Sequence, residues 1–358
     1  MKTAFNLKKS WVIFALLGSI SFLQAQEYQR TINKNFSLNP EGKVSIKNSY
    51  GTVKLNSWDK DEVAIEVTIT VKTKNENKAE EIFENMDIIF DATATEVSAR
   101  TQLPHHNRSW WSSWSFFGTN NLNYSIDYLV QMPKSAQLAI HNSYGNIYLD
   151  ETDGQAQLKC DYGRIDIGKL NHPDNSISIA YATSSEIDYI NGGKIKADYS
   201  GISIEQAQEI IYDADYTKGK FGHIKTLDFR TDYGSLGVEE VETFLGQADY
   251  ITLKIGQLKK ALKVNMDYGS LSIDQIEAST EEVSVTADYT GIRLGAAPDW
   301  DFAFTIETDY AGFKTDFPLD YSRKELDGSD RFYKGQHGSG KNQLSLRADY
   351  GNIKLTQN

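Results

Sequence analysis

The chain has 358 residues, a formal net charge of −12 at neutral pH and a single cysteine, Cys160. Such an acidic chain lacks the basic surface that nucleic acid phosphates require, so we expect no nucleic acid partner. Its charge favours solubility and low non-specific association. One cysteine cannot form an internal disulfide framework, so burial and hydrogen bonding must stabilise the fold.

Residues 1–25 predict a secretory signal peptide. Lys8 and Lys9 precede an apolar run over 11–23, and the small Ala25 follows it. The run is too short for a confident membrane span, so we expect no transmembrane span in the mature chain; an uncleaved anchor is the alternative. Cleavage after Ala25 removes three lysines and no acid, which makes the net charge −15. We therefore expect an exported protein of the periplasm or the cell surface.

The next irregular stretch, 56–137, predicts a small β-rich region with one short helix. Apolar and β-branched residues predict strands over 63–71, 87–90, 96–100 and 124–132. The sequence NKAEEIFENM at 77–86 predicts the helix. We expect this region to pack on the first repeats described below and to cover their open end, because an exposed β-repeat is a template for aggregation.

An aromatic segment, HHNRSWWSSWSFFGTNN at 105–121, separates two of these strands. Its candidate binding residues are Trp110, Trp111, Trp114, Phe116 and Phe117. A loop so rich in aromatic side chains is either a contact surface for a partner or a hydrophobic plug over the end of the repeats. The adjacent His105 and His106 diverge on an extended chain, so they do not by themselves predict a metal site.

An internal repeat centred on tyrosine dominates the remaining sequence. Typical copies are CDYGRIDI at 160–167 and MDYGSLSI at 266–273. Successive marker tyrosines are 17 to 21 residues apart, and Tyr350 follows the last of them after 40 residues. The regularly spaced markers are Tyr144, Tyr162, Tyr181, Tyr199, Tyr216, Tyr233, Tyr250, Tyr268, Tyr289 and Tyr310.

Apolar residues alternate with polar ones on both sides of each tyrosine. Leu158 and Cys160 stand four and two positions before Tyr162. Ile165 and Ile167 stand three and five positions after it. Alternation with period two is typical of a strand with one buried face. The change of phase predicts a corner between two strands, and the frequent glycine after the tyrosine suggests that the corner lies at this glycine.

One such unit cannot bury its own apolar face, so units should stack at strand spacing, about 4.8 Å. The sequence therefore predicts an all-β fold: a single-chain β-solenoid (β-helix) with 17–21 residues per rung and an N-terminal β-rich region containing one short helix. The expected divisions are a signal peptide at 1–25, the N-terminal region at 26–137 and the tyrosine-repeat solenoid at 138–358. A second irregular stretch, 317–341, is charged and glycine-rich and predicts a long exposed loop on one rung.

An aspartate precedes most of the marker tyrosines. These residues are Asp161, Asp198, Asp215, Asp232, Asp249, Asp267, Asp288, Asp309 and Asp349. Stacked in register, their carboxylates would repel by about 0.9 kcal/mol per neighbouring pair even in a water-like dielectric. A ladder of calcium ions would offset this repulsion. We favour a structural role in the turn, in which each carboxylate accepts a hydrogen bond from the amide two residues on, because Ser49 and Ser143 replace the aspartate and serine is a poor calcium ligand.

The tyrosines allow two interpretations. A column of rings would be a stacking platform for a sugar or another polymer, or it would fill the core or the corner by stacking on itself. The tyrosines share the parity of the buried positions before them, so we expect the second arrangement. We expect no metal and no cofactor.

The sequence contains no nucleophile elbow, no metal-ligand spacing and no phosphate loop, so we expect no enzyme. Cys160 occupies an inward repeat position and predicts a buried thiol rather than a nucleophile. A carbohydrate-active β-helix enzyme, a polysaccharide lyase or hydrolase, stays open as the alternative, because the paired carboxylates of a glycosidase do not form a sequence motif.

The pattern [ND]-[SD]-Y-G-x-[IVL]-x-[IVL], after a signal peptide and the strand WDKDEVAIEV at 58–67, resembles a family of exported bacterial β-strand-repeat proteins of unknown function, often labelled "putative adhesins". The resemblance covers about 43–355 and implies a β-solenoid in the cell envelope without catalytic residues. It implies a binding scaffold with an unidentified protein or glycan partner at the envelope. A structural or regulatory envelope component that binds another protein through a strand edge is a third possibility.

Overall fold

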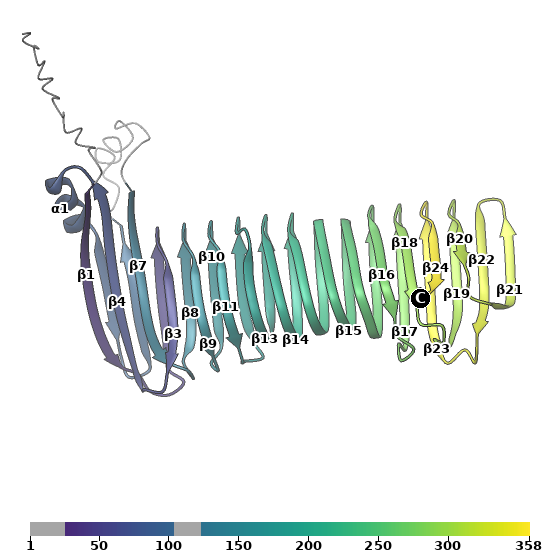
Figure 1. Ribbon diagram of the computed structural model, residues 1–358, viewed down its shortest axis with the longest axis horizontal. Coiled ribbons are helices and arrows are strands. Elements are labelled where there is room, and N and C mark those ends of the chain that lie inside the picture. The colour runs from purple at the N-terminus through teal and green to yellow at the C-terminus, as the bar shows by residue number, and fades with distance from the viewer. Residues whose placement is uncertain (1–25, 104–122) are drawn as a thin grey trace, which may run out of the picture.

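Strands make up most of the computed structural model, which describes residues 26–103 and 123–358. Within these ranges the chain has 24 strands and one α-helix, so the all-β prediction is confirmed. Figure 1 shows an elongated stack that runs from the N-terminal elements to the last strands. The predicted signal peptide, 1–25, and the aromatic residues Trp110, Trp111, Trp114, Phe116 and Phe117 lie outside the described residues.

The N-terminal elements alternate between strands of the stack and elements that cover its end. They are β1 (Gln26–Ser37), β2 (Lys43–Ser49), β3 (Val53–Trp58), β4 (Glu62–Thr73), α1 (Glu76–Asn85), β5 (Asp87–Ala92), β6 (Glu96–Gln102) and β7 (Asn123–Pro133). The strands and the helix predicted for this region are confirmed. The helix begins after Asn75, whose side chain accepts a hydrogen bond from the amide of Asn77, and it buries Ala79 and Ile82.

The tyrosine repeats supply the middle of the stack. Their strands are β8 (Gln137–Ser143), β9 (Ile147–Thr152), β10 (Ala156–Asp161), β11 (Ile165–Leu170), β12 (Asn175–Ala180), β13 (Ser185–Asp198), β14 (Gly201–Asp215), β15 (Lys218–Asp267), β16 (Ser270–Ile276), β17 (Glu282–Asp288) and β18 (Gly291–Ala296). The chain ends with β19 (Phe302–Asp309), β20 (Phe313–Thr315), β21 (Asp320–Asp327), β22 (Asp330–His337), β23 (Asn342–Asp349) and β24 (Ile353–Gln357).

Each repeat contributes one strand to each of two rows. The leading row contains the segments that end just before a marker tyrosine, and the trailing row contains those that follow it. Neighbouring repeats pair in parallel in both rows: Cys160 is opposite Asn142 and Ile179 in the leading row. Ile167 is opposite Leu149 and Ile187 in the trailing row. Main-chain hydrogen bonds therefore run along the length of the stack.

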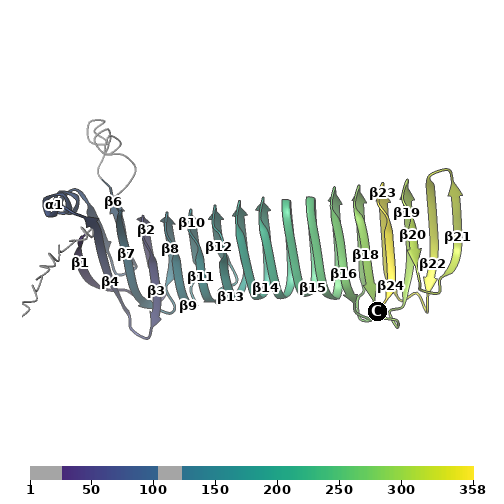
Figure 2. The ribbon, with the colours of Figure 1, turned by 45° about the horizontal axis from the view of Figure 1, so that its top comes forward.

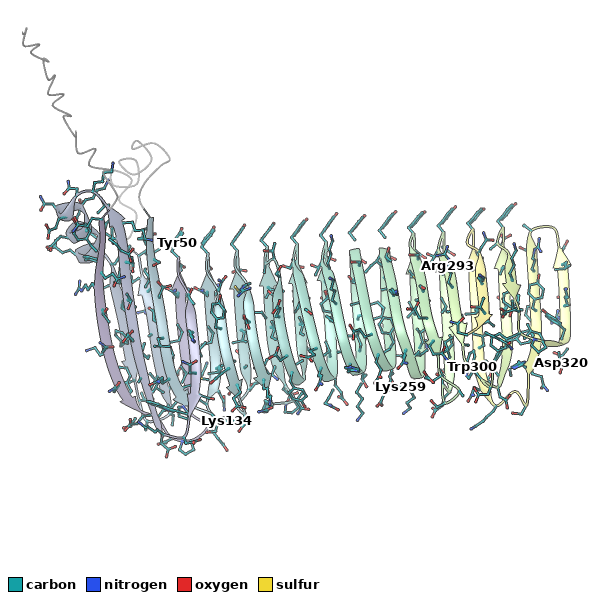
Figure 3. All side chains as sticks on the ribbon, in the orientation of Figure 1. Tyr50, Lys134, Lys259, Arg293, Trp300 and Asp320 are labelled. Carbon is teal, nitrogen blue, oxygen red and sulfur yellow. The ribbon has the colours of Figure 1, made fainter. Side chains whose placement is uncertain are left out.

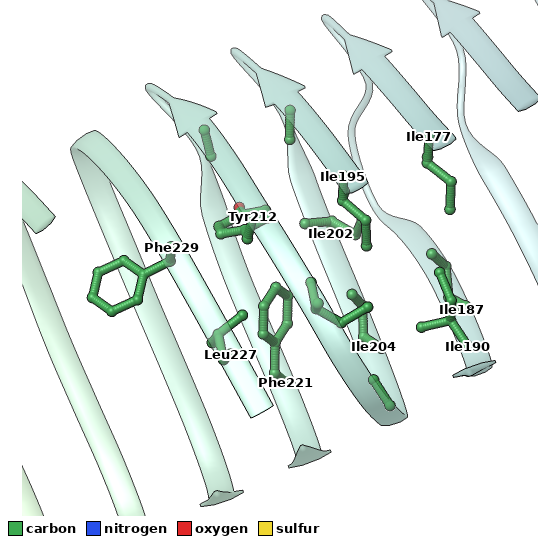
Figure 4. Packing of buried hydrophobic residues seen from close by; sticks show 14 of the residues in the cluster. Ile177, Ile187, Ile190, Ile195, Ile202, Ile204, Tyr212, Phe221, Leu227 and Phe229 are labelled. Atoms are coloured by element: carbon green, nitrogen blue, oxygen red, sulfur yellow. The ribbon is translucent and has the colours of Figure 1, made fainter. Parts of the chain in front are cut away.

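The apolar core lies between the two rows. In Figure 4 Ile177 and Ile195 from the leading row lie near Ile187 from the trailing row, and all three side chains are buried. Aromatic residues also meet across the core, where the rings of Tyr212 and Phe221 are edge to face with centroids 5.1 Å apart. The predicted alternation is therefore correct on both sides of the tyrosine. Each fully buried apolar side chain contributes roughly 1.5–3 kcal/mol before conformational entropy is subtracted.

At the N-terminal end the order in space differs from the order in the chain. The first repeat, formed by β2 and β3, lies between β6 and β7 on one side and β8 and β9 on the other. Antiparallel strands continue outward, with β5 on β6 and β4 followed by β1 on β7. The helix α1 packs on β4 and β1 at this end, as Figure 2 shows. The N-terminal region is thus continuous with the two rows.

The C-terminal end contains a second change of order. Strands β23 and β24 pair between the repeat formed by β17 and β18 and the repeat formed by β19 and β20. An antiparallel hairpin of β21 and β22 then pairs with β19. The prediction of a long exposed loop at 317–341 is therefore wrong, because β21 and β22 lie in this range. All eight residues of β21 are exposed, so this strand has no buried face and gives no alternating apolar pattern.

Candidate functional site: an exposed tyrosine ladder

The marker tyrosines form one continuous column of stacked rings, named here the tyrosine ladder. Its order is Tyr50, Tyr144, Tyr162, Tyr181, Tyr199, Tyr216, Tyr233, Tyr250, Tyr268, Tyr289, Tyr350 and Tyr310. Neighbouring ring centroids are 4.7 to 5.2 Å apart, with planes 2° to 7° from parallel. Figure 3 labels Tyr50, where the row of rings begins. Tyr124 closes this end by packing edge to face on Tyr50.

The corner of each repeat lies at the tyrosine itself. Every ladder tyrosine has a positive φ, between 46° and 63°, a conformation that costs an L-residue roughly 1–2 kcal/mol. The prediction that the following glycine forms the corner is wrong, since neither Gly145 nor Gly163 has a positive φ. Glycine is needed there for a different reason. A Cβ on Gly145 would overlap the main-chain carbonyl of Gly51 in the adjacent repeat.

The predicted self-stacking of the tyrosines is confirmed, but the ladder lies on the surface, so the burial expected from parity is wrong. From Tyr144 onward the ladder tyrosines are 44–66% exposed, as Tyr199 is at 52% and Tyr216 at 51%, whereas Tyr50 at the end of the column is less exposed. Parity along a strand predicts burial only while the backbone stays extended. The left-handed conformation at the tyrosine ends the strand and turns the side chain outward, away from the core.

The aspartates form a parallel column beside the ladder. Their main-chain carbonyls accept the amide of a tyrosine in the adjacent repeat, as Asp232 accepts the amide of Tyr216 at 2.9 Å. In the described repeats no aspartate carboxylate accepts the amide two residues on, so the hydrogen bond predicted for the turn does not form. The carboxylate of Asp161 is instead 3.5 Å from Lys159, and that of Asp198 is 3.6 Å from Lys196. A side-chain role for these aspartates in turn formation stays a prediction.

Partial burial and neighbouring charges raise the pKa values of groups in the aspartate column and in the ladder. Desolvation raises the pKa of the Asp215 carboxyl, and the carboxylates of Asp232 and Asp198 raise it further. Desolvation also raises the pKa of the Tyr250 hydroxyl, with smaller contributions from the neighbouring ring hydroxyls. Both shifts favour the protonated form, of the carboxyl at Asp215 and of the hydroxyl at Tyr250.

The stacking geometry limits what the ladder can bind. Both faces of an internal ring contact other rings, so a sugar cannot stack on them. The surface instead offers ring edges and hydroxyl groups, and no ladder hydroxyl forms a hydrogen bond within the described part of the chain. Tyr310, the last ring in the column, is the most exposed at 66%. The ladder is thus a straight strip with one phenol at each strand spacing.

The only cysteine, Cys160, is buried in the core. Burial raises the pKa of the Cys160 thiol to about 12, and the thiol lies 3.4 Å from the carbonyl oxygen of Gly145, so it is not a nucleophile at neutral pH. No three His, Cys, Asp or Glu side chains in 26–103 and 123–358 are grouped to hold a metal ion. No helix in these ranges is long and apolar enough to cross a membrane.

Comparison with known proteins gives no match to a family model or to a curated protein. Solved structures do match. A "putative adhesin" from Parabacteroides distasonis is 10% identical, covers 92% of this chain and 97% of its own, and has a TM-score of 0.31. A "putative cell adhesion protein" from Clostridium sporogenes is 14% identical over 92% of this chain and 100% of its own, with a TM-score of 0.17. A "putative lipid binding protein" from P. distasonis is 10% identical over 92% and 96%, with a TM-score of 0.28.

Proposed function

We propose that the chain is an exported β-solenoid that acts as a non-enzymatic, adhesin-like binding scaffold at the cell envelope or surface. Parallel pairing in both rows between repeats 17 to 21 residues apart supports the solenoid. A structure of this kind is stiff along its axis because each repeat is hydrogen-bonded to both neighbours. It therefore suits a role in holding a long surface in a fixed shape.

The tyrosine ladder is the observation that carries this proposal. Stacking of two aromatic rings contributes roughly 0.5–1.5 kcal/mol, whereas the left-handed backbone at each tyrosine costs roughly 1–2 kcal/mol. The two terms nearly cancel, so stability alone does not account for a tyrosine at twelve corners. Glycine would form the same corner without strain. Tyrosine rings and hydroxyls held at the surface are suited to contact with a partner, because tyrosine is enriched in binding interfaces.

The test is attachment of the purified mature protein to isolated cell envelopes. Replacing Tyr199, Tyr216 and Tyr233 with glycine removes three consecutive rings and relieves the strain at their corners. The matched control replaces Lys196, Asp213 and Arg230 with alanine, which changes three exposed side chains in the same repeats. We expect the tyrosine variant to lose most attachment and the control to keep it. Equal attachment by both variants would show that the ladder is not the contact surface.

The aromatic residues Trp110, Trp111 and Trp114 remain a proposed second contact. Their replacement by alanine should then abolish attachment without lowering the melting temperature. Location has its own test: protease accessibility on intact cells, with a periplasmic protein as control, separates surface display from the periplasm.

An enzyme on the same scaffold is the second candidate. The neighbouring carboxyl group of Asp309 raises the pKa of the Asp330 carboxyl, so these two groups lie close together. Glycosidase carboxyl pairs are instead separated by about 5–9.5 Å so that a sugar or a water fits between them. We therefore expect no turnover of acidic or neutral glycans by the purified protein, and reducing-end release from either class would overturn the non-enzymatic proposal.

A further inference from the structure

Three cations lie in consecutive strands at the C-terminal end of the trailing row. Arg293 on β18 is opposite Lys354 on β24, and Lys354 is in turn opposite Lys314 on β20. Adjacent strands are about 4.8 Å apart, and the three side chains leave the same face of the row, so they form a line of like charges, named here the cation row. Figure 3 labels Arg293 in this part of the stack.

No acidic side chain neutralises the cation row. Within the described residues Arg293, Lys354 and Lys314 form no ion pair and no side-chain hydrogen bond, and all three are exposed. Two acids on neighbouring positions have other partners: Asp274 pairs with Lys254 at 3.4 Å, and Asp316 accepts the amide of Gln357 at 2.8 Å. Like charges opposite one another on neighbouring strands destabilise a sheet. An uncompensated row in a chain of net charge −12 is therefore suited to binding an anion.

The cation row lines a groove of about 590 Å³, which the ladder residues Tyr289 and Tyr350 also line. Gly291 and Gly312 lie in the same groove and add no side chain to it. The side-chain oxygen of Asn352 accepts the amide of Gly312 at 2.9 Å, which leaves the side-chain nitrogen of Asn352 free to donate to a ligand.

The groove surface combines polar groups with the exposed rings of Tyr289 and Tyr350. Leu271, Ile292 and Ile353 lie in the strands that form it, but their side chains are only 1% exposed and belong to the core. The accessible groups include the hydroxyl of Ser270 and the amide of Asn352. The hydroxyl groups of a sugar would find hydrogen-bond partners in these polar groups.

We propose that this groove binds an anionic glycan. The cation row holds its carboxylate or sulfate groups, and Arg293 contributes a planar fork suited to two oxygens of one anion. Ser270 and Asn352 donate to the sugar hydroxyls. Repeated anionic groups along a glycan chain match a row in which cations recur at each strand. The site does not depend on the ladder being a contact surface.

The test compares two triple variants of the full mature chain. The groove variant is Arg293→Gln, Lys314→Gln and Lys354→Gln. The control is Lys54→Gln, Lys169→Gln and Lys220→Gln, which removes three exposed lysines of the trailing row from strands that are not adjacent to one another. Both variants change the net charge by the same amount. The probes are oligogalacturonate for carboxylate, a heparin oligosaccharide for sulfate, neutral dextran, and phosphatidylcholine vesicles with and without phosphatidylglycerol.

We expect the wild-type chain to bind one or both anionic oligosaccharides, with an affinity that falls as salt rises, and not to bind dextran. The groove variant should bind on the order of tenfold or more weakly, and the control within about twofold of wild type. The anionic ligand should raise the melting temperature of wild type and control but not of the groove variant, which stays folded because the substitutions relieve repulsion.

Three results would overturn the proposal. Equal losses in the two variants would mean that net charge, and not the groove, attracts the ligand. Failure of wild type to bind either anionic oligosaccharide would exclude the ligand class. Binding to vesicles that contain phosphatidylglycerol, without binding to the oligosaccharides, would assign the groove to a lipid headgroup.

Discussion

The left-handed corner at each ladder tyrosine predicts that replacement by glycine is less destabilising than replacement by alanine. Tyr216 has a φ of 51°, and its ring stacks at 4.8 Å on both Tyr199 and Tyr233. Replacement by alanine or by glycine removes both stacks, a loss of roughly 1–3 kcal/mol in each case. The two variants differ only in the backbone. Alanine retains roughly 1–2 kcal/mol of left-handed strain, which glycine does not have.

Tyr216→Gly should therefore be more stable than Tyr216→Ala. The strain relieved exceeds the roughly 0.5–1 kcal/mol that glycine costs in extended chain, so a net difference of about 0.5–1 kcal/mol is expected. Ile211 is the matched control, because it is 49% exposed on β14 and has no positive φ. There the usual order should hold, with Ile211→Ala more stable than Ile211→Gly by about 0.5–1 kcal/mol.

The assay is urea unfolding followed by far-ultraviolet circular dichroism, with midpoints compared among the four variants at equal protein concentration. Midpoints are the suitable quantity because repeat proteins can unfold in more than one step. If Tyr216→Ala is as stable as Tyr216→Gly while the Ile211 pair follows the usual order, the tyrosine corner is not strained. Stability alone would then be enough to account for tyrosine at this corner.

Gly145→Ala should lower the stability by roughly 1–3 kcal/mol in the same urea assay, because the added Cβ would overlap the carbonyl of Gly51. Gly237 has open space around it, so the control Gly237→Ala should leave the stability almost unchanged. Asp215→Asn should raise the melting temperature at about pH 7 by the equivalent of a few tenths of a kcal/mol, the scale of exposed charge interactions. The pKa of the Asp215 carboxyl is raised in the folded state, so the stability gained from its protonation is lost as pH rises through that pKa. The melting temperatures of the variant and the wild type should therefore converge at about pH 3. A difference in melting temperature that does not change with pH would contradict this. Burial raises the pKa of the Cys160 thiol to about 12, so the folded protein should resist iodoacetamide at about pH 8 and react once urea unfolds it. Mass spectrometry would measure the labelling. Rapid labelling of the folded chain would contradict the burial of Cys160.

Local periodicity in the sequence determined the elements of this protein. Alternation around Tyr162 correctly placed Cys160 and Ile165 in the core, because a strand that buries one face must alternate with period two. The helix at Glu76–Asn85 was predictable for a similar reason, since its capping and its apolar spacing are local. Such features depend on residues within a few positions of one another.

The tertiary structure alone decided how the repeats are ordered and which way the corners face. Tyr350 stacks between Tyr289 and Tyr310, although it follows both in the chain, because the same apolar pattern pairs equally well with any repeat. The position of each tyrosine in the alternating pattern could not show that its side chain turns outward at the corner. The cation row exists only because β24 lies between β18 and β20, which brings together side chains that are far apart in the sequence. Contacts between repeats depend on stacking order, and stacking order leaves no local pattern in the sequence.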